Sequence, residues 1–215
     1  MNSLTITRHE RLEEFPLIEV GEYLEKHTTQ YPIHCVNWPD VANYQPQAFF
    51  HIAHSGRAFF LHFKVRGEDL RAMNTEPLSP VADDSCVEFF MRVPGDKEYW
   101  NFEFNCIGTV NASHRVERPA PVRLTEAEIA SIGRYGSCGI TPFEEKTGVY
   151  EWTLTVKIPF DLLHMDKNSL PNQIMANVYK CANKTLHPHY LSWAPIHTAT
   201  PNFHVTSAFA PMILE

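Results

Sequence analysis

The stretch that decides the fold is SCVEFFMRVPGDKEYWNFEFNCI, residues 85–107. Its two halves alternate apolar with polar side chains, and a short turn signal containing Pro94 and Gly95 separates them. A period of two residues is typical of a β-strand, and a short glycine-containing gap is typical of a hairpin loop. The stretch therefore predicts two antiparallel strands, over residues 85–93 and 99–107, joined as a β-hairpin.

The rest of the chain repeats this strand character and contains little helix. Sixteen prolines are spread along the sequence and would break long helices. One short helix is expected after Thr125, because Glu128 lies three residues on, as in a capping box, and a second short turn is expected after Pro159. Many short strands with regular turns predict an all-β sandwich or barrel. The further strands are predicted over residues 48–53, 58–65, 150–158 and 174–181.

Length and charge limit the class of protein. The 215 residues match one sandwich domain, so we predict a single domain over residues 1–215. A net charge of −7 without clustered Lys and Arg argues against a nucleic-acid partner. No apolar run approaches the ~18 residues of a membrane span. The N-terminus does not resemble a signal peptide, so a cytoplasmic protein is expected, with a removed signal as the alternative.

The five cysteines have neither the number nor the spacing of a disulfide framework or a zinc motif. The sequence predicts buried free thiols in a reducing compartment. A bridge between Cys86 and Cys181 stays open as an alternative, provided that their strands face each other.

The polar face of the predicted hairpin has an unusual composition. Glu88 alternates with the apolar residues of its strand, Glu103 and Asn105 do the same in the partner strand, and a later strand adds Asn177 and Tyr179. Carboxylates and amides bind sugar hydroxyls, and aromatic rings stack on the C–H faces of sugars. The face therefore predicts a carbohydrate-binding surface, and an ordinary solvated sheet face is the alternative.

Two other functions, glycoside hydrolysis and zinc binding, have weaker support in the sequence. Glu88 and Glu103 on adjacent strands would form a pair of carboxylates about 5 Å apart, which is the spacing of a retaining glycosidase. No sequence feature forces a raised pKa on either group. His187, His189 and His204 are possible zinc ligands, although an H-x-H pattern occurs often by chance.

Several segments resemble one known family. DSCVEFF at residues 84–90, followed by YWNFEFN at 99–105, resembles the core hairpin of family 9 carbohydrate-binding modules. The resemblance spans residues 30–215 and is greatest to stand-alone bacterial proteins, through features such as Pro201-Asn202-Phe203-His204. The later segments that resemble the family, in the same order, are residues 152–159, 176–180, 191–195 and 201–214.

The resemblance implies a jelly-roll-like antiparallel β-sandwich that holds sugar ends, often with bound calcium, and does not convert them. Glu88 matches the glutamate that takes part in sugar binding in the family, and Asn177 matches its asparagine. Val81 stands where the family has the first of two stacking tryptophans, and Glu103 stands where the family has an arginine. The resemblance therefore implies a site that is partly kept and partly rebuilt.

We expect a concave, non-catalytic sugar-binding face, with a glycosidase or a protein-interaction module as alternatives. The hydrogen-bonding groups would be Glu88, Glu103, Asn105 and Asn177, and the stacking surfaces would be Tyr179, Trp38 or Trp193. Arg71 and Arg115 would clamp a charged sugar or an acidic partner. The metal ligands are unknown from the sequence, although Asp40, Asp83 and Asp84 offer oxygens of the kind that calcium prefers.

Overall fold

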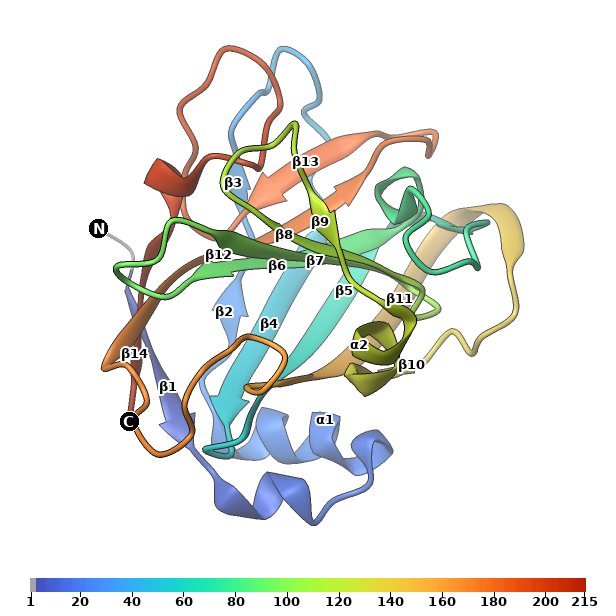
Figure 1. Ribbon diagram of the computed structural model, residues 1–215. Coiled ribbons are helices and arrows are strands. Elements are labelled where there is room, and N and C mark those ends of the chain that lie inside the picture. The colour runs from blue at the N-terminus through green and yellow to red at the C-terminus, as the bar shows by residue number, and fades with distance from the viewer. Residues whose placement is uncertain (1–2) are drawn as a thin grey trace.

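The computed structural model describes residues 3–215 and consists mainly of β-strands stacked in two layers (Figure 1). All six strands predicted from the sequence are present, so the predicted all-β sandwich is confirmed. The strands are β1 Leu4–Arg8, β2 Tyr31–Pro32, β3 Cys35–Val36, β4 Gln47–His54, β5 Ala58–Ala72, β6 Cys86–Arg92, β7 Tyr99–Asn105, β8 Val110–Arg115, β9 Val122–Arg123, β10 Gly133–Gly136, β11 Phe143–Pro159, β12 Gln173–Ala182, β13 His189–Ser192 and β14 Ala210–Leu214.

One layer has the strand order β10-β11-β5-β4, and the other has the order β14-β12-β6-β7-β8-β9. Strand β1 connects the layers, because its first half pairs with β14 and its second half pairs with β4. Both of these pairings are parallel, and the other strand pairings within residues 3–215 are antiparallel. The resulting sandwich is closed by hydrogen bonds along one edge.

The core lies between the layers and follows the alternation read from the sequence. Phe89 of β6 lies opposite Phe102 of β7, and both side chains are fully buried. They share one apolar cluster with Phe59 and Leu61 of β5 in the facing layer. Because successive side chains point to opposite sides of a strand, burial of this set turns Glu88 and Glu103 to the other side of their sheet.

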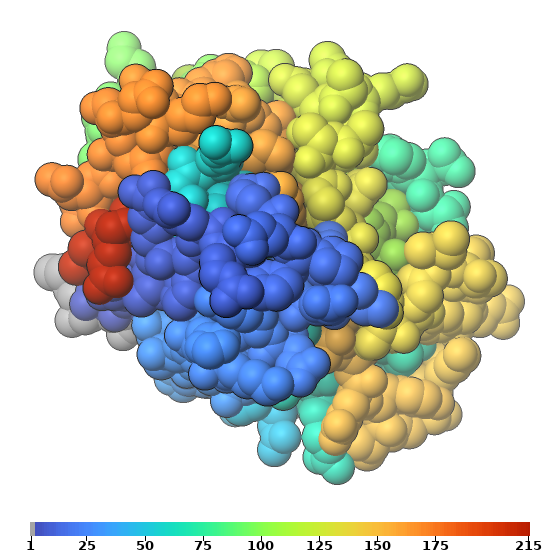
Figure 2. Space-filling model, turned by 90° about the horizontal axis from the view of Figure 1, so that it is seen from below, coloured from blue at the N-terminus to red at the C-terminus, as the bar shows by residue number. Residues whose placement is uncertain are grey.

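Two α-helices lie outside the sandwich: α1 over Leu17–His27 and α2 over Glu126–Ser131. The capping box predicted for α2 is present, since Thr125 and Glu128 exchange side-chain and backbone hydrogen bonds. The prediction missed α1, which packs Val20 and Leu24 against Phe60 on the outer side of β5. The residues near the N-terminus, dark blue in Figure 2, form the middle of the molecular surface on this side.

The turn predicted after Pro159 is present as a hydrogen-bonded turn and not as a helix. Neither α-helix of the described chain has the length and apolar content that a membrane-crossing segment needs.

Candidate ligand-binding site

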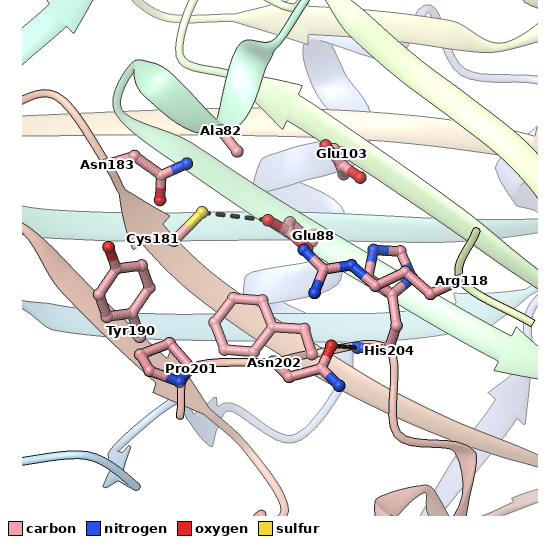
Figure 3. A pocket seen from close by; sticks show the side chains of 11 residues that line it. Ala82, Glu88, Glu103, Arg118, Cys181, Asn183, Tyr190, Pro201, Asn202 and His204 are labelled. Carbon is pink, nitrogen blue, oxygen red and sulfur yellow. Dashed lines mark hydrogen bonds between the residues drawn. The ribbon is translucent and has the colours of Figure 1, made fainter. Parts of the chain in front are cut away.

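A cavity of about 340 Å³ opens above the polar face of β6, β7 and β12 (Figure 3). Residues 201–204, here called the strap, form its other wall. The lining residues are Ala82, Glu88, Glu103, Arg118, Cys181, Asn183, Tyr190, Pro201, Asn202, Phe203 and His204.

The strand register explains why the two glutamates meet. Glu88 lies directly opposite Glu103 on β7 and directly opposite Tyr179 on β12. Cys86 and Cys181 form the next pair on the same face of the β6–β12 ladder. Directly opposed side chains on one sheet face lie about 5 Å apart at their Cβ atoms, so these groups form one continuous patch.

Glu88 is almost completely buried, with 3% of its surface exposed. Its Oε1 accepts a hydrogen bond from Cys181 Sγ at 3.0 Å. Burial raises the pKa of Glu88 well above its usual range, and the neighbouring Cys181 and Glu103 add to this effect. A raised pKa favours the protonated form, which offers a donor as well as an acceptor to a ligand hydroxyl.

Glu103 is held in a fixed position by amides on two strands. Its Oε1 accepts a hydrogen bond from Asn101 Nδ2 at 3.1 Å, and its Oε2 accepts one from Asn111 Nδ2 at 3.0 Å. Burial raises the pKa of Glu103, and the hydrogen bond from Asn111 and the charge of Arg115 partly offset this rise. The two glutamates therefore differ in their surroundings, although they face each other.

The strap is attached to the sheet through aromatic contacts. The ring of Phe203 stacks on Tyr179, whose hydroxyl donates to the Phe203 carbonyl at 3.1 Å. His204 Nδ1 lies 2.9 Å from the hydroxyl of Tyr99. Burial lowers the pKa of His204 to about 3, so its ring is neutral at physiological pH. The strap thus presents polar and aromatic groups to the cavity without adding a positive charge from this histidine.

Trp38 supports the strap from behind. The prediction of an exposed stacking surface at Trp38 is wrong, because the side chain is buried and its Nε1 donates to the carbonyl of Thr198 at 2.8 Å. Its ring packs 6.0 Å from Phe203 and 6.4 Å from Tyr190 between centroids. Trp38 therefore contacts two residues of the cavity wall and does not line the cavity itself.

Asn105 and Arg71 belong to a separate buried network around Asp84. Asn105 Nδ2 donates to Asp84 Oδ2 at 3.0 Å, and Arg71 Nε lies 3.3 Å from Asp84 Oδ1. Neither side chain lines the cavity. Asn105 lies on the same sheet face as Glu103, as its position in the strand requires. Its amide, however, binds Asp84 in the segment that precedes β6.

Asn177 and Trp193 have structural partners of their own. The amide of Asn177 is fully buried, and it binds the backbone of Ala194 and Ala208. Trp193 packs edge-on against Phe50 in the core between the layers, with ring centroids 6.1 Å apart. The structure therefore places both residues outside the cavity lining.

Arg115 lies beside the cavity lining, and its guanidinium donates to Ser113 Oγ and to the carbonyl of Arg118. The guanidinium of Arg118 itself lines the cavity. Sequence reasoning missed Arg118, Asn183 and Tyr190, which carry no periodic signal. The motif at residues 201–204 carries part of the family resemblance, and the structure places it in the cavity wall.

The aspartates that the sequence offered for calcium do not come together in one group within the described residues. The oxygens of Asp84 accept four N–H donors, from Met73, Asn74 and Asn105, which leaves no coordination side free. Asp83 is paired with Lys184 at 2.9 Å, and Asp40 is exposed. Within residues 3–215, the group of metal-ligating side chains that comes together is Cys86, Glu88 and Cys181.

Comparisons with known proteins give a consistent result. The model of carbohydrate-binding family 9 matches residues 20–214. A candidate carbohydrate-binding protein from Bacteroides uniformis ATCC 8492, known from a crystal structure, is 30% identical, with a TM-score of 0.89 over 100% of this chain and 98% of its own. A search of curated proteins gives no match.

A family 9 carbohydrate-binding module from Caldicellulosiruptor kristjanssonii has the same fold in two solved complexes. Its complex with glucose superposes with a TM-score of 0.62 at 10% identity, covering 100% of this chain and 96% of the module. Its complex with cellotriose gives a TM-score of 0.63 at 11% identity, covering 100% and 94%.

Proposed function

The chain belongs to carbohydrate-binding family 9, and we propose that it is a non-catalytic protein that holds a small sugar or glycan end in the cavity above Glu88 and Glu103. The observation that carries the proposal is the convergence of two buried carboxyl groups from neighbouring strands on one accessible cavity. Membership of the family agrees with the resemblance seen in the sequence.

The chemistry of the cavity suits a sugar. Glu88, Asn183 and Asn202 offer hydrogen-bonding groups for hydroxyls, and the rings of Tyr190 and Phe203 offer flat apolar surfaces. A volume of about 340 Å³ lies at the lower end of the roughly 300–1,000 Å³ that is typical of small-molecule sites. The cavity thus favours a small ligand or the end of a chain over an extended polysaccharide.

The surroundings of Glu103 favour binding over hydrolysis. A retaining glycosidase needs one free carboxylate as a nucleophile and one proton donor. Each oxygen of Glu103 accepts a hydrogen bond from an amide, and these bonds fix the orientation of the group and stabilise its charge, which makes it a weaker nucleophile. We therefore assign Glu88 and Glu103 a role in recognition.

The remaining expectations are consistent with this assignment. We infer that residues 1–215 form a single domain, because one apolar cluster is shared by both layers. We also infer that the protein works in a reducing compartment such as the cytoplasm, since all five cysteines are free thiols. The net charge of −7 supports the inference that nucleic acid is not a partner.

Isothermal titration calorimetry against a sugar panel tests the proposal. The panel contains glucose and cellotriose, which the Caldicellulosiruptor module binds, together with a uronic acid as a partner for Arg118. Asn183→Ala should weaken binding of the best sugar by about 10-fold, as expected for the loss of one well-placed hydrogen bond. Asn172→Ala, at an exposed position outside this cavity, is the matched control.

Glu88→Ala should weaken binding at least as much, and circular dichroism must show that the variant is folded. Absence of heat with every sugar, from a folded wild-type protein, would overturn the proposal. Unchanged affinity in both Asn183→Ala and Glu88→Ala would instead place the sugar elsewhere on the molecule.

A further inference from the structure

We propose that Cys86, Cys181 and Glu88 form a zinc-binding site at the floor of the cavity. Cys86 and Cys181 lie directly opposite each other in the β6–β12 ladder. Glu88 follows Cys86 by two residues and therefore points to the same face. In Figure 3, the side chains of Cys181 and Glu88 point toward each other.

The spacing of the three ligand atoms is close to what zinc requires. Cys181 Sγ and Glu88 Oε1 are 3.0 Å apart, and the ligand atoms of all three residues lie within 4.8 Å of one another. Tetrahedral zinc with Zn–S bonds of about 2.3 Å would hold two sulfurs about 3.8 Å apart. Adjustment of the side chains by an ångström or less would therefore complete the site.

The ligand set selects the metal. Two thiolates and one carboxylate suit zinc, whereas calcium and magnesium are bound by oxygen ligands alone. Cys181 and Glu88 line the cavity, so a fourth coordination position would face the space in which water or a ligand can lie. Three protein ligands with one open position describe an accessible zinc site and not a closed structural one.

A buried positive charge lies directly behind the three ligands. Lys180 is 2% exposed, and its ammonium group donates to the carbonyl of Cys181 at 2.7 Å. Binding replaces up to three protons, two from thiols and one from a carboxyl group, with one Zn²⁺, so the metal and its three ligands together carry a net charge of −1. Lys180 can balance that charge from the core side, and Arg118 can do so from the cavity side.

This site does not depend on sugar binding, and its test is separate. The protein is purified with a chelator and a non-thiol reductant, and denatured samples must show five reactive thiols, so that a Cys86–Cys181 disulfide is excluded. Titration with Co²⁺, a spectroscopic substitute for zinc, should give one equivalent with a thiolate-to-metal charge-transfer band. Competition with Zn²⁺ should remove the band.

Variants locate the site. Cys86→Ser and Cys181→Ser should each abolish the charge-transfer band. Glu88→Gln should weaken Co²⁺ binding by at least about 10-fold, because even loss of a residue that only hydrogen-bonds a metal ligand lowers metal affinity by that much. Cys35→Ser is the matched control, because Cys35 is a free thiol whose Sγ donates to the carbonyl of Trp193.

X-ray absorption at the zinc edge of the loaded wild-type protein keeps the test valid if a cysteine variant fails to fold. The expected result is two sulfur neighbours at about 2.3 Å together with oxygen neighbours. Fully reduced protein that binds no zinc, a shell without sulfur, or loss of the band in Cys35→Ser but not in Cys181→Ser would overturn the proposal.

Discussion

The rings of Phe203 and Tyr179 lie almost parallel, with centroids 4.2 Å apart and an angle of 11° between their planes. Tyr179 stands next to Glu88 on the polar sheet face, and Phe203 belongs to the strap. The stack therefore attaches the strap to the sheet directly beside the buried carboxyl group. It also explains why the cavity lies toward Cys181 and not over the centre of β12.

Phe203→Ala should loosen the strap and weaken sugar binding. The change removes a stacked pair that is worth about 0.5–1.5 kcal/mol beyond its buried area, so we expect affinity to fall by about 2- to 12-fold. Calorimetry with the best sugar measures the effect, and Phe203→Tyr, which keeps the aromatic ring, is the control. Binding equal to that of the wild type in Phe203→Ala would mean that the strap plays no part in recognition.

Asp84→Asn should destabilise the fold strongly. The carboxylate is fully buried and accepts four N–H donors beside Arg71, so an amide would place its own N–H group against those donors. Loss of one member of a buried charged network costs about 3–5 kcal/mol. Urea denaturation measures the free energy of unfolding, and the exposed Asp161→Asn should leave it within about 0.5 kcal/mol of the wild type. A loss below 1 kcal/mol for Asp84→Asn would contradict the argument.

His62 should make the protein less stable as the pH falls from about 6.5 to 4. Burial lowers its pKa from 6.5 to about 4, and the charge of Glu25 only partly offsets this. Between these values the unfolded chain takes up a proton that the folded chain does not, so folding stability is lost toward acid. At about 1.4 kcal/mol per pH unit, the loss is on the order of 3 kcal/mol.

His62→Gln should therefore flatten the dependence of unfolding free energy on pH within this window. Urea denaturation at a series of pH values measures the slope, and the exposed His197→Gln is the control. Parallel curves for His62→Gln and the wild type would show that His62 does not carry the acid sensitivity.

Gly136→Ala should destabilise the protein because of a contact with backbone. A Cβ atom at this position would lie 2.7 Å from the carbonyl oxygen of Cys106, which cannot rotate away. Overpacking of this kind costs about 1–3 kcal/mol. Gly139→Ala meets no atom within 4 Å, and its left-handed φ of +74° should cost about 1 kcal/mol. Thermal unfolding compares the two, and a milder effect at Gly136 would contradict the prediction.

The sequence was sufficient to predict the strands that carry the site. Alternation in residues 85–107 separated the core side chains from Glu88 and Glu103, because period-two geometry requires that separation wherever one face is buried. It could not reveal α1, since Val20 and Gly21 are weak helix formers and the packing of Leu24 against the outer side of β5 decides the conformation.

The candidate site was only partly predictable. Alternation shows which face a residue occupies but not what covers that face, so Asn177 was expected to meet a ligand, whereas it binds the backbone of Ala194. The cavity wall comes from loops, where Asn183 follows no period. Cys86 and Cys181 are far apart in the chain and form no sequence motif. Only the register of β6 and β12 brings them together, and the sequence does not show that register.

The direct opposition of Glu88 and Glu103 limits how this family member can change. Deletion of one residue within β7 would turn its phenylalanines toward water and force its carboxylate into the apolar interior. Length is therefore constrained in β6 and β7, whereas Asn183, which lines the cavity from a loop, can vary without changing the pairing of these strands. We therefore expect differences in ligand preference within the family to lie in the loops around the cavity, and not in the length of β6 or β7.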